Sequence, residues 1–164
     1  MKHLVCFVLP LLLSSLGFLQ AETDVFFNDC GSLFSIKNVA FESDCPEYPR
    51  PCSLYINEPL NISITLESGK LSADDVVSEA KVSFLGTAPI PLLVTPEDCP
   101  QSFCPVAANE EKMYNATVLL QTSLPSTDSD LFFYIHPRGN TDIYLVNIQM
   151  RVVIAQKVKL NNGK

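Results

Sequence analysis

Tryptophan is absent from this chain, and glycine, histidine and basic residues are sparse. The six glycines are not clustered, which excludes a glycine-rich phosphate loop. Eleven Lys and Arg residues face 18 Asp and Glu residues, for a net charge of −7. This balance disfavours nucleic acids, because their binding depends on Lys and Arg neutralising phosphates. Anionic membrane surfaces are disfavoured for the same reason.

Only one histidine, His136, lies beyond the N-terminal segment, so a Ser or Cys nucleophile would have a single candidate base. His136 directly precedes the turn-forming residues 137–140, and we interpret it as an exposed turn histidine. The adjacent carboxylates Asp74-Asp75 and Glu110-Glu111 need not converge, because neighbouring side chains on an extended chain face opposite ways. We therefore predict a protein that is not an enzyme and has no cofactor.

The first 21 residues have the pattern of a secretory signal peptide: an N-terminal Lys2, an apolar stretch and a small residue, Ala21, at the expected cleavage position. The strongly apolar part, residues 4–13, is shorter than the roughly 20 residues that a membrane span needs. We predict one secreted domain over residues 22–156 and a frayed tail over 157–164.

Cysteine spacing fits an oxidising compartment. Two pairs are close in sequence, Cys45 with Cys52 and Cys99 with Cys104, and we expect each pair to form a local disulfide. Cys30 is then left as a free thiol. Zinc is the competing interpretation of clustered cysteines, but neither spacing is that of a zinc knuckle, so we predict no metal site.

The hydrophobic pattern is that of strands. Residues 61–66 alternate polar and apolar side chains, as in a half-buried strand. Similar short runs occur at residues 33–41, 80–85, 114–120, 131–135 and 143–154, separated by turn-forming clusters. A weak helical pattern at residues 72–80 is too short and polar to outweigh them. The chain is predicted to be all-β, as an antiparallel sandwich or barrel.

Two N-glycosylation sequons begin at Asn61 and Asn115. The signal peptide would route the chain past the glycosylation machinery, so both asparagines are candidates for modification. Asn61 is expected to face solvent, because Ile62 and Ile64 would share the opposite side of the strand.

The apolar run of residues 84–94 contains Pro89 and Pro91, which cannot donate to a sheet ladder. This run is therefore expected at a sheet edge or sheet end. There it could line the mouth of an internal cavity or simply complete the core, and composition alone favours the core.

Four motifs occur in the order and spacing of one family: Asn28-Asp29-Cys30-Gly31-Ser32, Pro51-Cys52-Ser53-Leu54, residues 86–91, and Cys99 to Cys104 followed by Pro105-Val106. In this combination the chain resembles the ML lipid-recognition family, and within it the soluble Niemann-Pick type C sterol carriers and the mite group-two allergens. The resemblance implies an immunoglobulin-like sandwich of two antiparallel sheets with an apolar cavity between them that holds one lipid.

The resemblance also implies residues for the site. Leu92 takes the place of an aromatic residue at the pocket entrance, and Leu120 and Leu124 fall near two further entrance positions. At such a mouth, Leu92→Asp is expected to weaken lipid binding more than folding. Residues implied for the cavity lining are Ile64, Val82, Phe84, Phe133 and Val146.

In the sterol carriers, the cysteine that corresponds to Cys30 is bonded to one near the C-terminus, where this chain has Leu145. The resemblance thus implies that the long-range disulfide is missing and that Cys30 and Leu145 face each other. We expect Cys30 to be buried, with a Cys30-linked dimer as the alternative to a monomer.

The leading functional hypothesis is a secreted carrier that holds a sterol or another lipid and hands it to a membrane or a lipid-transfer receptor. The alternative is a recognition module of innate immunity or host interaction that presents a lipid to a receptor. Residence outside the cell or in a lysosome-like compartment stays open.

Overall fold

The computed structural model describes residues 23–42, 45–46, 50–84 and 87–156. The predicted signal peptide and the predicted C-terminal tail lie outside these residues. In the described part of the chain every regular element is a β-strand, and no helix there has the length and apolarity needed to cross a membrane. The prediction of an all-β chain is confirmed.

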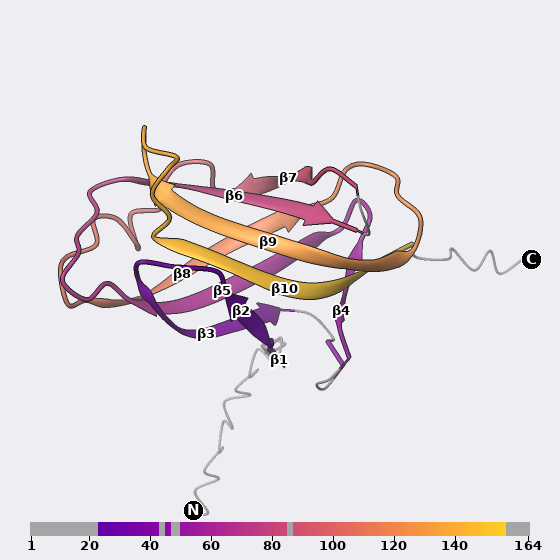
Figure 1. Ribbon diagram of the computed structural model, residues 1–164, viewed down its shortest axis with the longest axis horizontal. Helices are drawn as coiled ribbons and strands as arrows, with labels where there is room; N and C mark the ends of the chain where they lie inside the picture. The colour runs from indigo at the N-terminus through magenta and orange to yellow at the C-terminus, as the bar shows by residue number, and fades with distance from the viewer. Residues whose placement is uncertain (1–22, 43–44, 47–49, 85–86, 157–164) are drawn as a thin grey trace, which may run out of the picture.

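One sheet, called sheet A here, lies behind the other in Figure 1 and is antiparallel throughout. Its strands pair in the order β1 (Thr23–Asp24), β3 (Ser35–Glu42), β5 (Pro59–Glu67) and β8 (Glu111–Leu119).

The second sheet, sheet B, lies in front and is built around two long strands, β9 (Thr127–Pro137) and β10 (Val146–Ala155). Strand β6 (Val76–Ser83) pairs with β9. Strands β2 (Phe27–Asp29) and β4 (Cys52–Tyr55) both pair with β10, and β4 runs parallel to it.

Strand β7 (Ile90–Thr95) passes from one sheet to the other. Its first half, Ile90 to Leu92, pairs with β6 of sheet B, and its second half, Leu93 to Thr95, pairs with β8 of sheet A. Each half of β7 therefore has a neighbouring strand on one side only. Pro91, which has no N–H to donate, is tolerated at such an edge position.

The core lies between the two sheets. Side chains alternate along β5, β6, β8, β9 and β10, so that every second residue points inward. The inward residues of β5, for example, are Leu60, Ile62, Ile64 and Leu66, all buried. Packing of two apolar faces in this way is what holds a β-sandwich together.

Candidate functional site

The structure brings the eight residues implied for the entrance and lining into one hydrophobic cluster between the sheets. Six belong to the buried core: Ile64, Val82, Leu92, Leu120, Phe133 and Val146. The other two, Phe84 and Leu124, are partly buried and pack against it.

This apolar interior is filled by its own side chains. Ile64, Val82, Phe133 and Val146 are each 0% exposed. Close packing of this kind leaves no room for a lipid unless side chains move or the sheets separate. The interior has the expected apolar character, and a ligand between the sheets would have to displace part of the packing.

Leu92 lies where β7 changes sheets. It pairs with Ala80 of β6, and the next residue, Leu93, pairs with Leu119 of β8. Continuing this antiparallel register by one residue places Leu92 beside Leu120. Leu92 is only 9% exposed, however, so Leu92→Asp would put a charge into the core and destabilise folding as well as binding. The inward packing of Leu92 therefore adds a folding cost to the expected loss of lipid binding.

A groove of about 560 Å³ opens on the outer side of this crossing, and we call it the β6–β7 groove. It forms because β7 leaves β6 after Leu92 while β6 continues back to Val76. It is lined by residues 77–81 of β6, residues 91–94 of β7, Glu97, Asp98 and Arg138. The volume lies within the roughly 300–1,000 Å³ of small-molecule sites.

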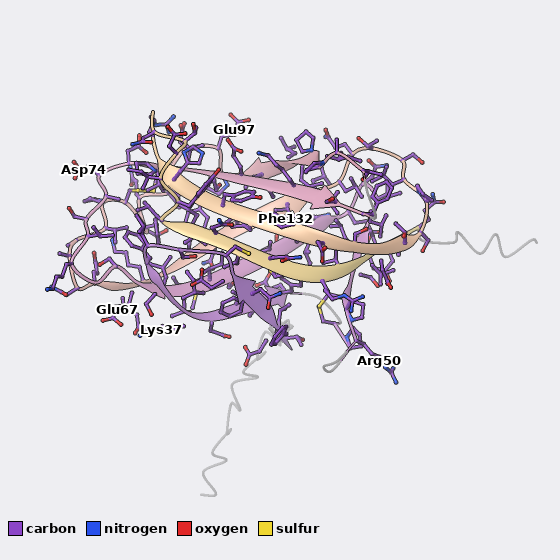
Figure 2. The ribbon with its side chains drawn as sticks, viewed as in Figure 1. Lys37, Arg50, Glu67, Asp74, Glu97 and Phe132 are labelled. Carbon is purple, nitrogen blue, oxygen red and sulfur yellow. A yellow bond between two sulfur atoms is a disulfide. The ribbon has the colours of Figure 1, made fainter. Side chains whose placement is uncertain are left out.

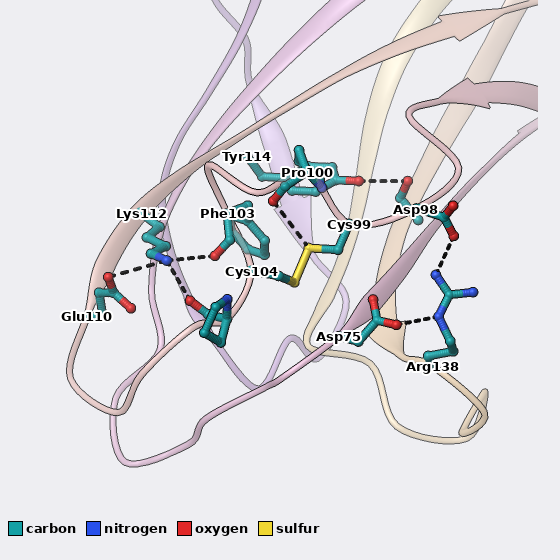
Figure 3. The surroundings of a disulfide bond; sticks show 12 residues. Asp75, Asp98, Cys99, Pro100, Phe103, Cys104, Glu110, Lys112, Tyr114 and Arg138 are labelled. Carbon is teal, nitrogen blue, oxygen red and sulfur yellow. Dashed lines mark hydrogen bonds and ion pairs between the residues drawn. A yellow bond between two sulfur atoms is a disulfide. The ribbon is translucent and has the colours of Figure 1, made fainter.

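Charged side chains surround the β6–β7 groove in pairs. Lys81 Nζ lies 3.2 Å from Glu79 Oε2, and Arg138 donates to Asp98 Oδ1 at 2.6 Å and also to Asp75. Figure 3 shows Arg138 between these two aspartates. Partial desolvation raises the pKa of Glu79, but Lys81 and His136 together outweigh it and hold this pKa below its usual value.

His136 is buried, at 4% exposed, and the interpretation as an exposed turn histidine is wrong. Strand β9 extends to Pro137, so His136 lies within the strand rather than in the turn that follows. Its Nε2 is 3.4 Å from Glu79 Oε1, and its Nδ1 is 3.3 Å from the carbonyl oxygen of Pro137.

Two hydroxyl groups meet across the sandwich beneath the β6–β7 groove. Tyr114 Oη of β8 lies 2.9 Å from Ser78 Oγ of β6, and both residues are buried. The Tyr114 ring contacts Phe103 edge-on, with centroids 4.8 Å apart. Burial raises the pKa of the Tyr114 phenol, against a smaller lowering by the Ser78 hydrogen bond, so the phenol stays protonated. Neither residue stands out in the sequence, because strand periodicity does not show which inward residues meet across the core.

Both predicted disulfides, Cys45–Cys52 and Cys99–Cys104, are present. The second lies next to Tyr114 and closes a loop that Lys112 also holds (Figure 3). Lys112 Nζ donates to the carbonyl oxygens of Phe103 and Pro105 at 2.7 and 2.6 Å. This network fixes Phe103 against Tyr114.

Among the described residues, Asp75, Cys99 and Cys104 form a group that resembles a metal site, because the Asp75 carboxylate lies within 4.8 Å of the two sulfurs. Those sulfurs are bonded to each other and are therefore not thiolate ligands. The carboxylate of Asp75 instead accepts a hydrogen bond from Arg138.

Cys30 is a free and exposed cysteine, so the expectation that it is buried is wrong. Its backbone N–H donates to the carbonyl oxygen of Asn147, and residues opposite each other in a ladder point to the same face. Asn147 in turn pairs with Tyr134, whose ring lies on the outer face of sheet B.

Cys30 also does not face Leu145. Leu145 is buried, and its carbonyl oxygen accepts from the N–H of Phe34. The resemblance to the sterol carriers implied that Cys30 lies opposite Leu145. In the structure Cys30 lies opposite Asn147, two residues further along the chain. A Leu145→Cys variant is accordingly not expected to bond with Cys30.

The two sequons lie side by side on the outer face of sheet A. Asn61 is opposite Thr117 and Ser63 is opposite Asn115 in the β5–β8 ladder. Asn115 is exposed, whereas Asn61 is half-buried and engaged: its amide donates to Glu42 at 2.8 Å and accepts from Thr117 at 2.6 Å.

Comparisons with known proteins agree with this architecture. A solved structure of a Niemann-Pick type C2 protein from the Japanese carpenter ant aligns with a TM-score of 0.64 at 18% identity, covering 79% of this chain and 99% of that one. An alkylpurine DNA glycosylase of Pseudomonas fluorescens bound to DNA aligns only at a TM-score of 0.40, with 12% identity over 76% of this chain and 31% of that one, and carries no weight. No curated protein sequence matches the chain. The model of the ML domain family matches residues 24–152, and the chain belongs to that family.

Proposed function

We propose that this protein is a secreted, non-enzymatic lipid carrier that holds one sterol or other lipid between its two sheets. The observation that carries the proposal is the predominantly apolar interior between the two sheets of an ML domain. Strand β7 joins the sheets at one edge, and the short segment from β1 to β2 joins them at the other. A ligand would therefore be accommodated by rearranged core side chains with only a limited separation of the sheets.

Burial of lipid hydrocarbon supplies the binding free energy. Each Å² of apolar lipid surface removed from water contributes about 25 cal/mol to binding. Part of this gain offsets the loss of contacts between core side chains when the sheets separate. We assign Leu92, Leu120 and Leu124 to the entrance, since the β7–β8 register places the first two together, and we assign Ile64, Val82, Phe84, Phe133 and Val146 to the lining.

A presenting role in innate immunity or host interaction is the second candidate, and a row of aromatic side chains on the outer face of sheet B favours it. The ring of Phe132, labelled in Figure 2, stacks on the ring of Tyr134 with centroids 6.4 Å apart. The Tyr134 ring contacts the ring of the exposed Tyr144 with centroids 5.3 Å apart. Aromatic rows on a surface are typical of protein contact sites. The same row would serve a carrier that docks on a membrane receptor.

Lipid extraction separates the two functions. The protein is purified from a secreting eukaryotic host without detergent, and the bound lipid is extracted and identified by mass spectrometry. A carrier is expected to yield one sterol or simple neutral lipid per chain. An acylated glycolipid would favour presentation, and a chain that carries no lipid and takes up none from vesicles would contradict both functions.

Secretion through an oxidising compartment is supported by the two disulfides. We further propose glycans on Asn61 and Asn115, which would cover the outer face of sheet A and leave the aromatic row of sheet B uncovered. Sorting to a lysosome-like compartment would then depend on these glycans.

A further inference from the structure

The hydroxyl pair of Ser78 and Tyr114 differs from the other buried serine hydroxyls in the described part of the chain. The Ser68 hydroxyl donates to the carbonyl oxygen of Ala107 and accepts from the N–H of Glu110. The Ser129 hydroxyl donates to the carbonyl oxygen of Thr127. These contacts hold local loops or strand ends. Ser78 and Tyr114 instead join β6 of sheet B to β8 of sheet A, within the apolar space where a ligand would lie.

This pair keeps unused hydrogen-bonding capacity. Each hydroxyl has one donor and can accept, and the bond between them uses one donor and one acceptor. Among the described residues neither hydroxyl has a further hydrogen-bond partner. Whichever oxygen donates, one donor and at least one acceptor site remain for a third group.

The pair is also placed where a ligand could reach it. Ser78 lines the β6–β7 groove, at the part of β6 that β7 does not cover, and is 7% exposed. Tyr114 lies directly behind it at 1% exposed. A polar group that enters the apolar interior from this side meets the hydroxyl pair first.

We propose that the Ser78–Tyr114 pair is the polar anchor of the lipid site and selects a neutral lipid that carries a hydroxyl group. The proposal rests on the lipid-carrier function. A ligand hydroxyl donates one hydrogen bond and accepts another, which matches the donor and the acceptor left over by the pair. The three hydroxyls would form a closed ring of hydrogen bonds, with the hydrocarbon of the ligand in the core.

Carboxylates and hydrocarbons do not match this arrangement. An ionised carboxylate only accepts hydrogen bonds, so it would leave the remaining acceptor without a donor, and it would carry a charge into an apolar interior. It would also pass Glu79, Glu97 and Asp98, whereas Lys81 and Arg138 are already paired with carboxylates. A hydrocarbon would leave both spare groups unused.

The test compares monounsaturated C18 lipids with different head groups. Oleyl alcohol, oleate and 1-octadecene compete against a bound fluorescent sterol, for the full secreted protein and for Ser78→Ala and Tyr114→Phe. The wild type is expected to bind oleyl alcohol about tenfold more tightly than 1-octadecene, since two net hydrogen bonds contribute about this much, and also more tightly than oleate. In either variant the preference over 1-octadecene should fall to about twofold or less.

Ser129→Ala is the matched control, because it removes another buried serine hydroxyl of sheet B without touching the pair. It should keep the tenfold preference, and melting curves of all variants verify that they are folded. Equal binding of oleyl alcohol and 1-octadecene by the wild type, or a preference that survives in both variants, would overturn the anchor while leaving lipid binding intact. Failure of every probe to bind would instead overturn the carrier function and the anchor together.

Discussion

Phe133→Ala is expected to lower the melting temperature of the lipid-free protein by about 10–20 °C and to make the protein more responsive to lipid. Phe133 is fully buried on β9, and truncating such a ring costs about 3–5 kcal/mol. The cavity left behind is apolar and lies within the proposed site, beside Tyr114, at a ring-centroid distance of 6.2 Å. A lipid can then fill space that it must otherwise clear, so saturating lipid should raise the melting temperature of the variant more than that of the wild type.

Phe132→Ala is the control for this experiment. Phe132 is adjacent in sequence but points to the outer face of sheet B, where it stacks on Tyr134 (Figure 2). Its loss should lower stability much less than the loss of Phe133 and leave the response to lipid unchanged. Scanning calorimetry with and without a sterol gives both quantities. An equal lipid response in the two variants would contradict the location of the ligand between the sheets.

Removing both disulfides is expected to bring the protein close to unfolding at 37 °C. Each bond closes a short loop and contributes about 2–3 kcal/mol by chain entropy, and together they account for a large share of the 5–15 kcal/mol of a typical domain. Cys52 belongs to β4, and the Cys99–Cys104 loop carries Phe103 into contact with Tyr114. The quadruple change of Cys45, Cys52, Cys99 and Cys104 to alanine should therefore lower the urea midpoint sharply.

Cys30→Ala provides the comparison, since Cys30 is free and exposed. Its effect on the free energy of unfolding should stay within about 0.5 kcal/mol, as for ordinary surface substitutions. A quadruple variant whose urea midpoint equals that of Cys30→Ala would contradict the stabilising role of the two loops.

Strand periodicity predicted the fold class well, because an inward and outward alternation is a local property of the sequence. The alternation at residues 61–66 corresponds to part of β5, and the runs at 114–120 and 131–135 correspond to β8 and β9. The helical pattern at residues 72–80 is instead occupied by the start of β6 from Val76, where pairing with β9 prevails over a weak local preference.

Properties that depend on register were harder to predict. Cys30 lies opposite Asn147 rather than Leu145 because of the register of the β2–β10 ladder and the turn at Asp29. The Asp29 carboxylate accepts hydrogen bonds from the N–H groups of Gly31 and Ser32 in this turn. The meeting of Ser78 with Tyr114 is likewise a contact between two sheets, 36 residues apart in sequence. Such contacts have no local signature, since they depend on how the sheets pack.

Photo-crosslinking with a diazirine sterol, followed by peptide mapping, tests most directly whether the ligand lies between the sheets. The sterol is bound at one equivalent per chain and irradiated, and the modified residues are located by tandem mass spectrometry. A ligand between the sheets is expected to give adducts on inward-facing residues of both sheets, among them Ile64 of β5 and Val82 or Phe133 of sheet B. Adducts confined to outward residues such as Phe132 and Tyr134 would contradict this location of the ligand.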